Sequence, residues 1–338
     1  MPGNPHEIRK SHIFAVATQL GRPCVINLSQ GDYIGAHDGT SLLERGLDAL
    51  LTTPGRAFVK SAGNAALDGA HASGSLAVGV AQDLKVVFTP PPGSTSTGTM
   101  DLWYEARDRF EITVITPSGA SSGTVNAGTS TTLTLANGNQ AFIDSSLANP
   151  FNGDNRIFVR LLRGSLADIA PGTWTLRLRA TKAGAGGGFH IWAQRGDGLR
   201  FQAPHVNRDS TISIPGTAKR VLSIGSFVTR FANGSAVGSL SAFSSRGPTR
   251  DGRMKPEISA PGEEIISASA IVAGQFIPMS GTSMAAPHAT GAIALMLQGA
   301  PQLTMAAIRQ RLLKAAVTDA HTVGAPDSNW GQGKLRAV

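Results

Sequence analysis

The hydrophobic pattern of this chain changes twice along its length, and each pattern requires a different kind of sheet. From Lys85 to Arg195 the apolar residues alternate with polar ones, as in Trp174, Leu176 and Leu178, and clusters of Gly, Ser, Thr and Asn separate the runs. Alternation with a period of two is typical of strands that bury one face. We therefore expect an antiparallel β-sandwich of about eight strands in this segment.

The segment before this sandwich has the pattern of an α/β fold. A helix is expected over Pro5–Leu20, and the short apolar run Cys24–Leu28 is typical of a parallel strand buried on both faces. Ser41, with Glu44 three residues later, forms a capping box that begins a second helix. Another strand starts at Ala57, and this strand–helix–strand order indicates a doubly wound parallel sheet.

The α/β pattern returns after the sandwich. Two parallel strands and two helices are expected there, over Val221–Phe227, Glu264–Ala268, Thr282–Gln298 and Thr304–Val317. The simplest architecture is a partial doubly wound α/β domain, residues 1–75 and 206–338, interrupted by a β-sandwich domain, residues 76–205.

Composition and charge exclude several other classes of protein. The 338 residues include one cysteine, Cys24, so an intrachain disulfide and a cysteine-rich zinc site are both excluded. The net charge of +8 comes from scattered Lys and Arg, which does not indicate a nucleic-acid partner. No apolar stretch reaches about 18 residues, and Met1–Lys10 contains no apolar signal core. We expect no membrane partner, no metal and no cofactor, and the compartment stays open.

The residues that carry chemistry stand at the start of the third expected helix. In the run Gly281–His288, Ser283 falls in the first turn, where it faces unpaired backbone N–H groups and the positive end of the helix dipole. That position suits a nucleophile whose substrate oxygen becomes negative. His288 lies five residues further on, about 140° away around the helix. We therefore expect His288 to pack in the core and not to serve Ser283 as a base.

The run Gly281–His288 resembles the nucleophile signature of the subtilase family of serine proteases. Further stretches, in the family's order, resemble its substrate-binding strand, its oxyanion-hole motif, the approach to the nucleophile and the end of the domain: Asn27–Gly31, Ser61–Asn64, Phe243–Pro248 with Lys255–Gly262, and Trp330–Gly333. The resemblance covers roughly residues 1–75 and 206–338. The sandwich lies outside it, although insertions at this point do occur in subtilases.

The resemblance implies roles for residues of two groups. Ser283 would attack the scissile carbonyl of a peptide or protein substrate, and the Asn64 side-chain amide with the Ser283 backbone N–H would hold the oxyanion.

The substrate-binding group would consist of residues at the ends of two strands. Ser29, Gln30 and Gly31 would pair with the peptide backbone as an added strand. Gly31 and Gly63 would line the first specificity pocket, where the missing Cβ leaves room for a side chain, and Ala62 belongs to the same set.

The Asp and the His of a subtilase triad have no counterpart in this chain. Asp144, Asp209 and Asp327 precede a serine, but no glycine follows, and none of the eight histidines is followed by glycine. His37, in His-Asp-Gly-Thr, comes after the substrate-binding strand, whereas both missing motifs of the family should precede it. We therefore expect an upstream segment, absent from this chain, to carry Asp and His, and the chain as it stands to be inactive.

Three hypotheses for the function follow from these residues. The first is a serine endopeptidase represented by part of its catalytic domain. The second is a catalytically dead subtilase remnant that binds peptides or a partner through its sheet edge or its sandwich. The third is that the sandwich is the functional module, binding glycan or protein, with the α/β part as a scaffold. Genomic sequence just upstream of Met1 would distinguish the first two.

Overall fold

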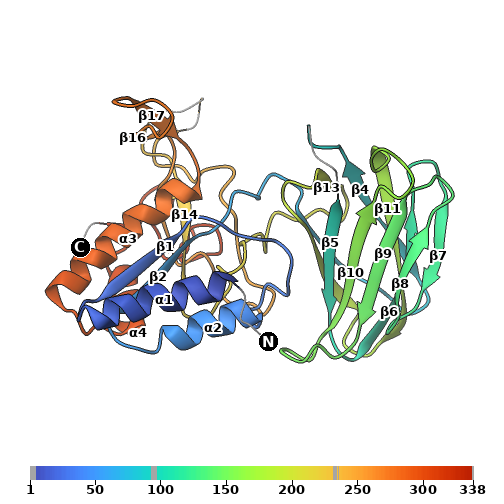
Figure 1. The fold of residues 1–338 in the computed structure, drawn as a ribbon, viewed down its shortest axis with the longest axis horizontal. Helices are drawn as coiled ribbons and strands as arrows, with labels where there is room; N and C mark the ends of the chain where they lie inside the picture. Colours follow the sequence, from blue (N-terminus) through green and yellow to red (C-terminus); the bar gives the residue numbers. More distant parts are fainter. Residues whose placement is uncertain (1–4, 93–96, 231–233, 235, 337–338) are drawn as a thin grey trace. The chain divides into compact units, whose positions relative to one another are not determined.

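The computed structural model describes residues 5–92, 97–230, 234 and 236–336, which form two compact units. The first unit contains the residues up to Asp32, His37–Ala66 and the residues from Asp209 on, and we call it the parallel-sheet unit. The second contains Tyr33–Ala36 and Leu67–Arg208, and we call it the two-sheet unit. Each unit has a hydrophobic core of its own. Figure 1 shows the helices and strands of both units.

The parallel-sheet unit is built on four parallel strands with helices packed against them. The strands lie in the order β1 (Cys24–Leu28), β2 (Arg56–Ser61), β14 (Leu222–Phe227) and β15 (Ile258–Pro261). The helices are α1 (Pro5–Gln19), α2 (Leu42–Leu50), α3 (Thr282–Gly299) and α4 (Met305–Lys314). Helix α3 contacts all four strands, and its Ala285, Ala289 and Ile293 are fully buried. Broadly, this is the α/β arrangement that the sequence predicts.

The helix caps follow from the sequence and are confirmed. The Ser41 hydroxyl accepts a hydrogen bond from the Glu44 backbone N–H, and the Glu44 carboxylate accepts from the Ser41 N–H, so the capping box is complete. Thr304 caps α4 in the same way, its hydroxyl accepting from the Ala307 N–H at 3.2 Å. These bonds satisfy backbone donors that a helix cannot pair within itself.

Strand β1 is less buried than its apolar run predicts. Among the described strands it lies at the end of the sheet and pairs only with β2, from Cys24 opposite Arg56 to Leu28 opposite Lys60. Asn27 is exposed, and only Ile26 in the strand is buried. The expectation of burial on both faces is therefore wrong for this strand, because a continuous apolar run does not show whether a second neighbour lies beside it.

The fourth parallel strand is not the one that the sequence predicts. Ile265–Ala268 forms β16, which pairs antiparallel with β17 (Phe276–Met279) as an exposed two-stranded hairpin. The parallel neighbour of β14 is instead β15, with Ile258 opposite Ile224. The prediction of a parallel strand over Glu264–Ala268 is wrong, because a short β-branched run suits a hairpin as well as a parallel sheet.

The two-sheet unit consists of antiparallel strands throughout its named pairs. The strands of its six-stranded sheet lie in the order β3 (His71–Ser75), β12 (Gly188–Ala193), β5 (Gly98–Tyr104), β10 (Asn155–Leu162), β9 (Gln140–Ser146) and β8 (Ser130–Thr134). Those of its five-stranded sheet lie in the order β13 (Leu199–Phe201), β4 (Ala81–Phe88), β11 (Gly172–Ala183), β6 (Asp108–Ile115) and β7 (Ser121–Val125). Between residues 86 and 200, the described residues contain no helix.

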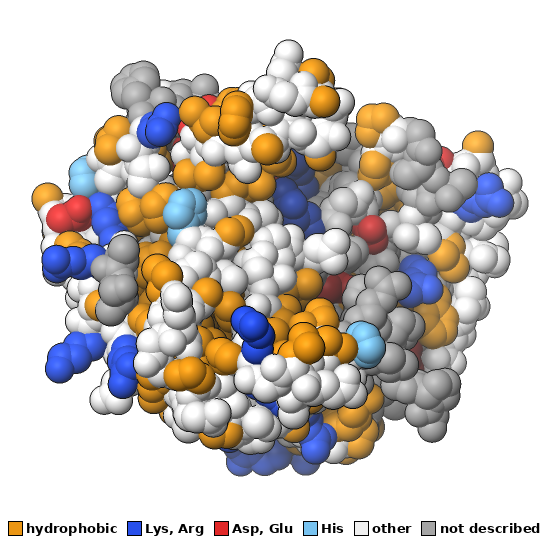
Figure 2. All heavy atoms as spheres, turned by 60° about the vertical axis from the view of Figure 1, so that its left-hand side comes forward, with side chains coloured by type: hydrophobic (Ala, Val, Ile, Leu, Met, Phe, Trp, Pro, Cys, Tyr) orange, Lys and Arg blue, Asp and Glu red, His pale blue; other side chains and the backbone are white. Residues whose placement is uncertain are grey.

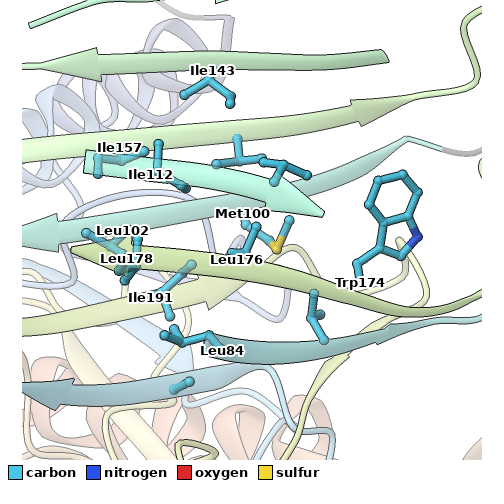
Figure 3. Close-up of a cluster of buried hydrophobic side chains, with 14 of the residues drawn as sticks. Leu84, Met100, Leu102, Ile112, Ile143, Ile157, Trp174, Leu176, Leu178 and Ile191 are labelled. Carbon is cyan, nitrogen blue, oxygen red and sulfur yellow. The ribbon is translucent and has the colours of Figure 1, made fainter. Parts of the chain in front are cut away.

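Alternating side chains of both sheets meet in one core. Leu102 and Ile157 from the six-stranded sheet and Leu176 and Ile112 from the five-stranded sheet belong to the same buried cluster (Figure 3). The alternation is direct in β6, where buried and half-buried residues take turns from Asp108 to Ile115. In β6 the pattern in the sequence therefore corresponds to one buried face, whereas every residue of β5 is buried.

Strand β3 shows where the two patterns separate. His71–Ser75, which the sequence expectation left with the α/β part, pairs with β12 at the edge of the six-stranded sheet, with Ala72 opposite Ile191. The segment reads His-Ala-Ser-Gly-Ser and has almost no apolar pattern. Such an edge strand takes its place from the neighbour with which it pairs, so its own residues give no signal.

Candidate active site

Ser283 lies in the first turn of α3, with Gly281 in the capping position before the helix. Its hydroxyl donates a hydrogen bond to the backbone oxygen of Ser29 at 3.3 Å. In return the Ser29 hydroxyl donates to the backbone oxygen of Ser283 at 3.0 Å. The start of α3 is thus joined to the chain that follows β1, so the strand end and the helix start share one site.

Asn64 reaches the same helix start from the end of β2. Its side-chain oxygen accepts hydrogen bonds from Thr282 twice, from the backbone N–H at 3.0 Å and from the hydroxyl at 2.8 Å. The Gly63 backbone N–H also donates to the Thr282 hydroxyl, at 3.1 Å. The carboxyl ends of parallel strands lie at one edge of a sheet. Ser29 and Ser283, 254 positions apart along the chain, therefore come together at the same edge as Asn64.

Gly281 has no side chain, and the space that a Cβ atom would take is bordered by two N–H donors and by the Met284 Sδ at 3.7 Å. A Cβ atom added to Gly281 would lie 3.1 Å from the Asn64 Nδ2 and 3.7 Å from the Ser283 backbone nitrogen. The two hydrogen bonds that Asn64 Oδ1 accepts from Thr282 hold the amide plane, so its NH2 group is directed to this space. The site can therefore present two donors to one small negatively charged oxygen.

The predicted substrate-binding residues lie around this site with different degrees of exposure. Ser29 is half-buried, whereas Gln30 and Gly31 are exposed beyond the end of β1. Ala62 is fully buried, and the sheet uses both of its backbone polar groups: its N–H donates to Ile224 O at 2.9 Å and its carbonyl accepts from the Ser213 N–H at 2.8 Å. The backbone groups of Ala62 are therefore not available to a substrate.

Two histidines that the sequence singles out are not placed as bases for Ser283. His288 is exposed, with its Nδ1 2.9 Å from the backbone oxygen of Met284, so the expectation that it packs in the core is wrong. It diverges from Ser283 as the helix geometry predicts, but toward the surface, because α3 leaves one of its faces uncovered. His37 is buried, and its Nδ1 lies 2.9 Å from the backbone oxygen of Ile212.

Sequence reasoning missed a polar pair beside the site, Lys60 and Ser213. Lys60 belongs to β2 and is fully buried, and its ammonium donates to the Ser213 hydroxyl at 3.0 Å. The signal was a lysine inside the run Ala-Phe-Val-Lys-Ser, where an apolar residue would be usual.

The described residues hold no group of three or more His, Cys, Asp and Glu side chains that could bind a metal ion. None of the described helices is long and apolar enough to span a membrane.

Comparison with known proteins agrees with this fold and these motifs. The model of the subtilase family, Peptidase_S8, matches residues 164–333, half of the chain. The chain belongs to this family, which is one of serine proteases.

Individual relatives support the same assignment over parts of the chain. The serine protease AprX of Bacillus subtilis (strain 168) is 39% identical over 114 residues, 30% of this chain and 26% of AprX. An uncharacterized protein of Aquifex aeolicus (strain VF5), aq_aa18, is 36% identical over 146 residues, 36% of this chain and 64% of that protein. The chain thus spans less than two thirds of the length of either relative.

A solved structure matches nearly the whole chain. The CspB protease of Clostridium perfringens superimposes with a TM-score of 0.84 at 26% sequence identity, over 97% of this chain and 68% of CspB. The likeness extends over both units of the chain, since a match of that coverage includes the two-sheet unit as well as the parallel sheet.

Proposed function

We propose that this chain carries the nucleophile and the oxyanion hole of a subtilase that hydrolyses peptide bonds. In this proposal Ser283 attacks the scissile carbonyl, and the Asn64 Nδ2 and the Ser283 backbone N–H stabilise the oxyanion that forms. The observation that carries the proposal is the position of Gly281, because the Asn64 Nδ2 and the Ser283 backbone nitrogen lie 3.1 and 3.7 Å from the place that a Cβ atom would take there. A substrate oxygen in that space would receive two hydrogen bonds from groups that are already in place.

A serine hydroxyl also needs a base, and we propose that the base comes from outside these 338 residues. The hydroxyl of Ser283 donates to the carbonyl oxygen of Ser29, which cannot accept the proton at neutral pH. An imidazole held by a carboxylate performs this task in serine proteases. We therefore infer that an upstream segment supplies the His and the Asp, and that the chain without it is inactive.

The surface of α3 supports the presence of such a segment. Its exposed residues follow one another at helical spacing, and we call them the α3 stripe: Pro287, His288, Gly291, Ala294, Leu295, Gln298 and Gly299. Helix α3 contains no Asp, Glu, Lys or Arg, although a helix face open to water is normally charged. Figure 2, turned so that the left-hand side of Figure 1 comes forward, shows patches of hydrophobic side chains on that face of the molecule, with scattered Lys and Arg and few acidic side chains. We propose that the segment carrying Asp and His covers the α3 stripe and extends the sheet at β1.

The substrate is proposed to be a peptide or protein in an extended conformation. Ser29, Gln30 and Gly31 continue from the edge strand β1 and would pair with the substrate backbone, while Gly63 lies beside the nucleophile helix. In this account the parallel-sheet unit is one partial doubly wound catalytic domain, so the expected bounds 1–75 and 206–338 narrow to those of that unit, and the two-sheet unit is an insertion into it.

The proposal is tested with the chain joined to an upstream segment that carries Asp-Ser/Thr-Gly and His-Gly-Thr motifs. We expect hydrolysis of a fluorogenic peptide that Ser283→Ala abolishes. Asn64→Ala should lower kcat about 10²–10³-fold, the effect that loss of one such donor has in subtilisin. Ser280→Ala, three residues before the nucleophile, is the control and should keep the rate. A joined protein that binds the peptide without cleaving it would instead favour a dead remnant that acts by binding.

A further inference from the structure

The outward face of the five-stranded sheet gathers cationic side chains that are far apart in the sequence. Strand β11 pairs with β4 on one side and with β6 on the other, so alternate residues of the three strands share this face. Two of the outward residues, Asp83 and Glu111, are acidic. The excess of four positive charges is half of the net charge of the chain, and it comes from six cations of four neighbouring strands: Lys85, Arg109, Arg177, Arg179, Lys182 and Arg200.

Four of these cations follow β11, and we call them the cation row: Lys85, Arg177, Arg179 and Lys182. Lys85 belongs to β4, but its ammonium donates to the Thr175 hydroxyl of β11 at 2.8 Å and so lies beside the outward position before Arg177. Lys182 follows an irregularity in the pairing with β6, where it is opposite Arg109. Alternate residues of a strand are about 7 Å apart, so the row presents a positive charge at each step over about 20 Å.

The two carboxylates on this face orient the arginines without using all of their donors. Arg177 binds Asp83 through Nε at 2.7 Å and through Nη2 at 2.9 Å, and the Arg179 Nη1 lies 3.5 Å from a Glu111 oxygen. A guanidinium has five N–H donors, so each arginine keeps donors for a ligand. About half of each arginine side chain is exposed, 49% for Arg177 and 54% for Arg179, so a ligand can reach these donors.

The uncharged residues of the face indicate which kind of anion it suits. The outward positions of β4, β6 and β11, all of them described, contain no aromatic side chain on which nucleic-acid bases could stack or which could anchor a protein partner. Threonine hydroxyls, which can exchange hydrogen bonds with the hydroxyls of a sugar, lie beside the cations: Thr113, Thr173 and Thr181. A linear polymer with repeated anionic groups and many hydroxyls is complementary to both features.

We propose that this face binds a linear acidic polysaccharide, one that carries carboxylate or sulfate groups on its repeating units. The cation row contacts the anionic groups, in charge-assisted hydrogen bonds that are roughly twice as strong as neutral ones. The threonines contact the sugar hydroxyls. The inference is independent of the proposed catalytic function, because all of these residues belong to the two-sheet unit. Its function would be to hold the chain on a polymer.

The test measures binding of the 338-residue chain to three polysaccharides by calorimetry. Polygalacturonate carries carboxylates, heparin carries sulfates as well, and dextran is neutral. We expect at least one of the two acidic polymers to bind in about 0.1 M salt, and the stronger of the two identifies the preferred anionic group. Dextran should not bind, and about 1 M salt should abolish binding, because the Debye length falls from about 10 Å to about 3 Å. Failure of both acidic polymers to bind, or equal binding of dextran, would overturn the proposal.

Variants assign the binding to the cation row. The double variant Arg177→Gln, Arg179→Gln should weaken binding about tenfold, because two adjacent charge-assisted contacts are lost. The control, Arg311→Gln with Lys314→Gln, removes the same charge from exposed positions of α4 and should keep the affinity. Equal losses in the two double variants would show that net charge alone attracts the polymer and would overturn the site.

Two further measurements complete the test. Lys182→Gln, at an exposed position at one end of the row, leaves both ion pairs intact and should also weaken binding, which decides the matter if the arginine variant does not fold. A single-stranded oligonucleotide and poly-glutamate are compared with the polysaccharides at equal concentrations of charge. Tighter binding of either one would overturn the choice of a polysaccharide as the partner.

Discussion

At the residue scale, Gly281 and Asn64 show how a site depends on an atom that is missing. Gly281 has no Cβ atom. A Cβ atom at this position would lie 3.1 Å from Asn64 Nδ2. The backbone of Gly281 also has a φ of +154°, a conformation that other residues rarely adopt. Glycine is therefore required at this position both for the helix start and for the proposed oxyanion hole.

The first prediction concerns this glycine. In the chain joined to its proposed upstream segment, Gly281→Ala should lower kcat about 10²–10³-fold, because the methyl group blocks the approach of an oxygen to Asn64 Nδ2. Gly299→Ala is the matched control, since a Cβ atom there meets nothing within 4 Å, and it should keep the rate. A Gly281→Ala enzyme that folds and cleaves at the unmodified rate would show that the oxyanion lies elsewhere.

The second prediction concerns Lys255, a buried lysine at the entry to β15. Burial lowers the pKa of its ammonium from 10.5 to about 8, against the opposing effect of Glu257, whose carboxylate lies 2.6 Å away. Between about pH 8 and 10.5 the unfolded chain therefore holds a proton that the folded chain has lost. The free energy of unfolding should rise with pH across that window through this group, because the unfolded state binds more protons there.

Lys255→Met provides the comparison for that window. Urea unfolding at a series of pH values should give a difference, unmodified protein minus variant, that rises between about pH 8 and 10. A difference that stays constant or falls with pH would mean that the pKa of Lys255 is not lowered in the folded protein.

At the element scale, strands β5 and β10 contain an ion pair whose burial matters more than its geometry. Arg156 binds Asp101 through two nitrogens, at 2.6 and 3.1 Å, and Arg177 binds Asp83 in the same way, at 2.7 and 2.9 Å. The Asp101 side chain is fully buried, whereas 31% of the Asp83 side chain and 49% of the Arg177 side chain are exposed. Burial raises the pKa of Asp101, and Arg156 opposes that rise.

The third prediction compares these two pairs. Arg156→Met should lower the free energy of unfolding by about 3–5 kcal/mol, because it leaves a buried carboxylate without its cation. Arg177→Met should cost much less than Arg156→Met, because exposed ion pairs contribute little to stability. Chemical denaturation measures both, and equal losses would show that burial does not govern the difference.

The α3 stripe carries the fourth prediction. Leu295 is 59% exposed on an uncharged helix, so the chain alone should bind hydrophobic dyes and self-associate. Leu295→Gln should reduce dye binding and association with little change in stability. Ile293→Ala, at a fully buried position of the same helix, should cost about 2–5 kcal/mol instead. A monomeric chain that binds no dye would contradict the view that the stripe is normally covered.

At the scale of the whole molecule, local signals in the sequence proved more informative than tertiary ones. The Ser41–Glu44 capping box depends on residues close together, and it forms as predicted; the predicted starts of β1 at Cys24 and of α3 at Thr282 are also confirmed. Asn64 at the end of β2 also reaches Thr282, the residue before Ser283, since parallel strands present their carboxyl ends at one edge.

The failures concern features that only a neighbour in space decides. Whether an apolar run such as Ile265–Ala268 enters the parallel sheet depends on the strands available to it, and the exposure of His288 depends on what covers α3. The polar pair of Lys60 and Ser213 was missed because its two residues lie 153 positions apart in the chain.

The central claim is that the catalytic base lies outside these 338 residues, and the hydrolysis rate of the chain alone tests it most directly. Purified chain and its Ser283→Ala variant are compared on a fluorogenic peptide, with and without phenylmethylsulfonyl fluoride. We predict the same rate for both proteins and no effect of the inhibitor, because in this account the imidazole that accepts the proton of Ser283 comes from the upstream segment. Inhibitor-sensitive hydrolysis by the unmodified chain, lost in Ser283→Ala, would show that a base is present within it and would contradict this account.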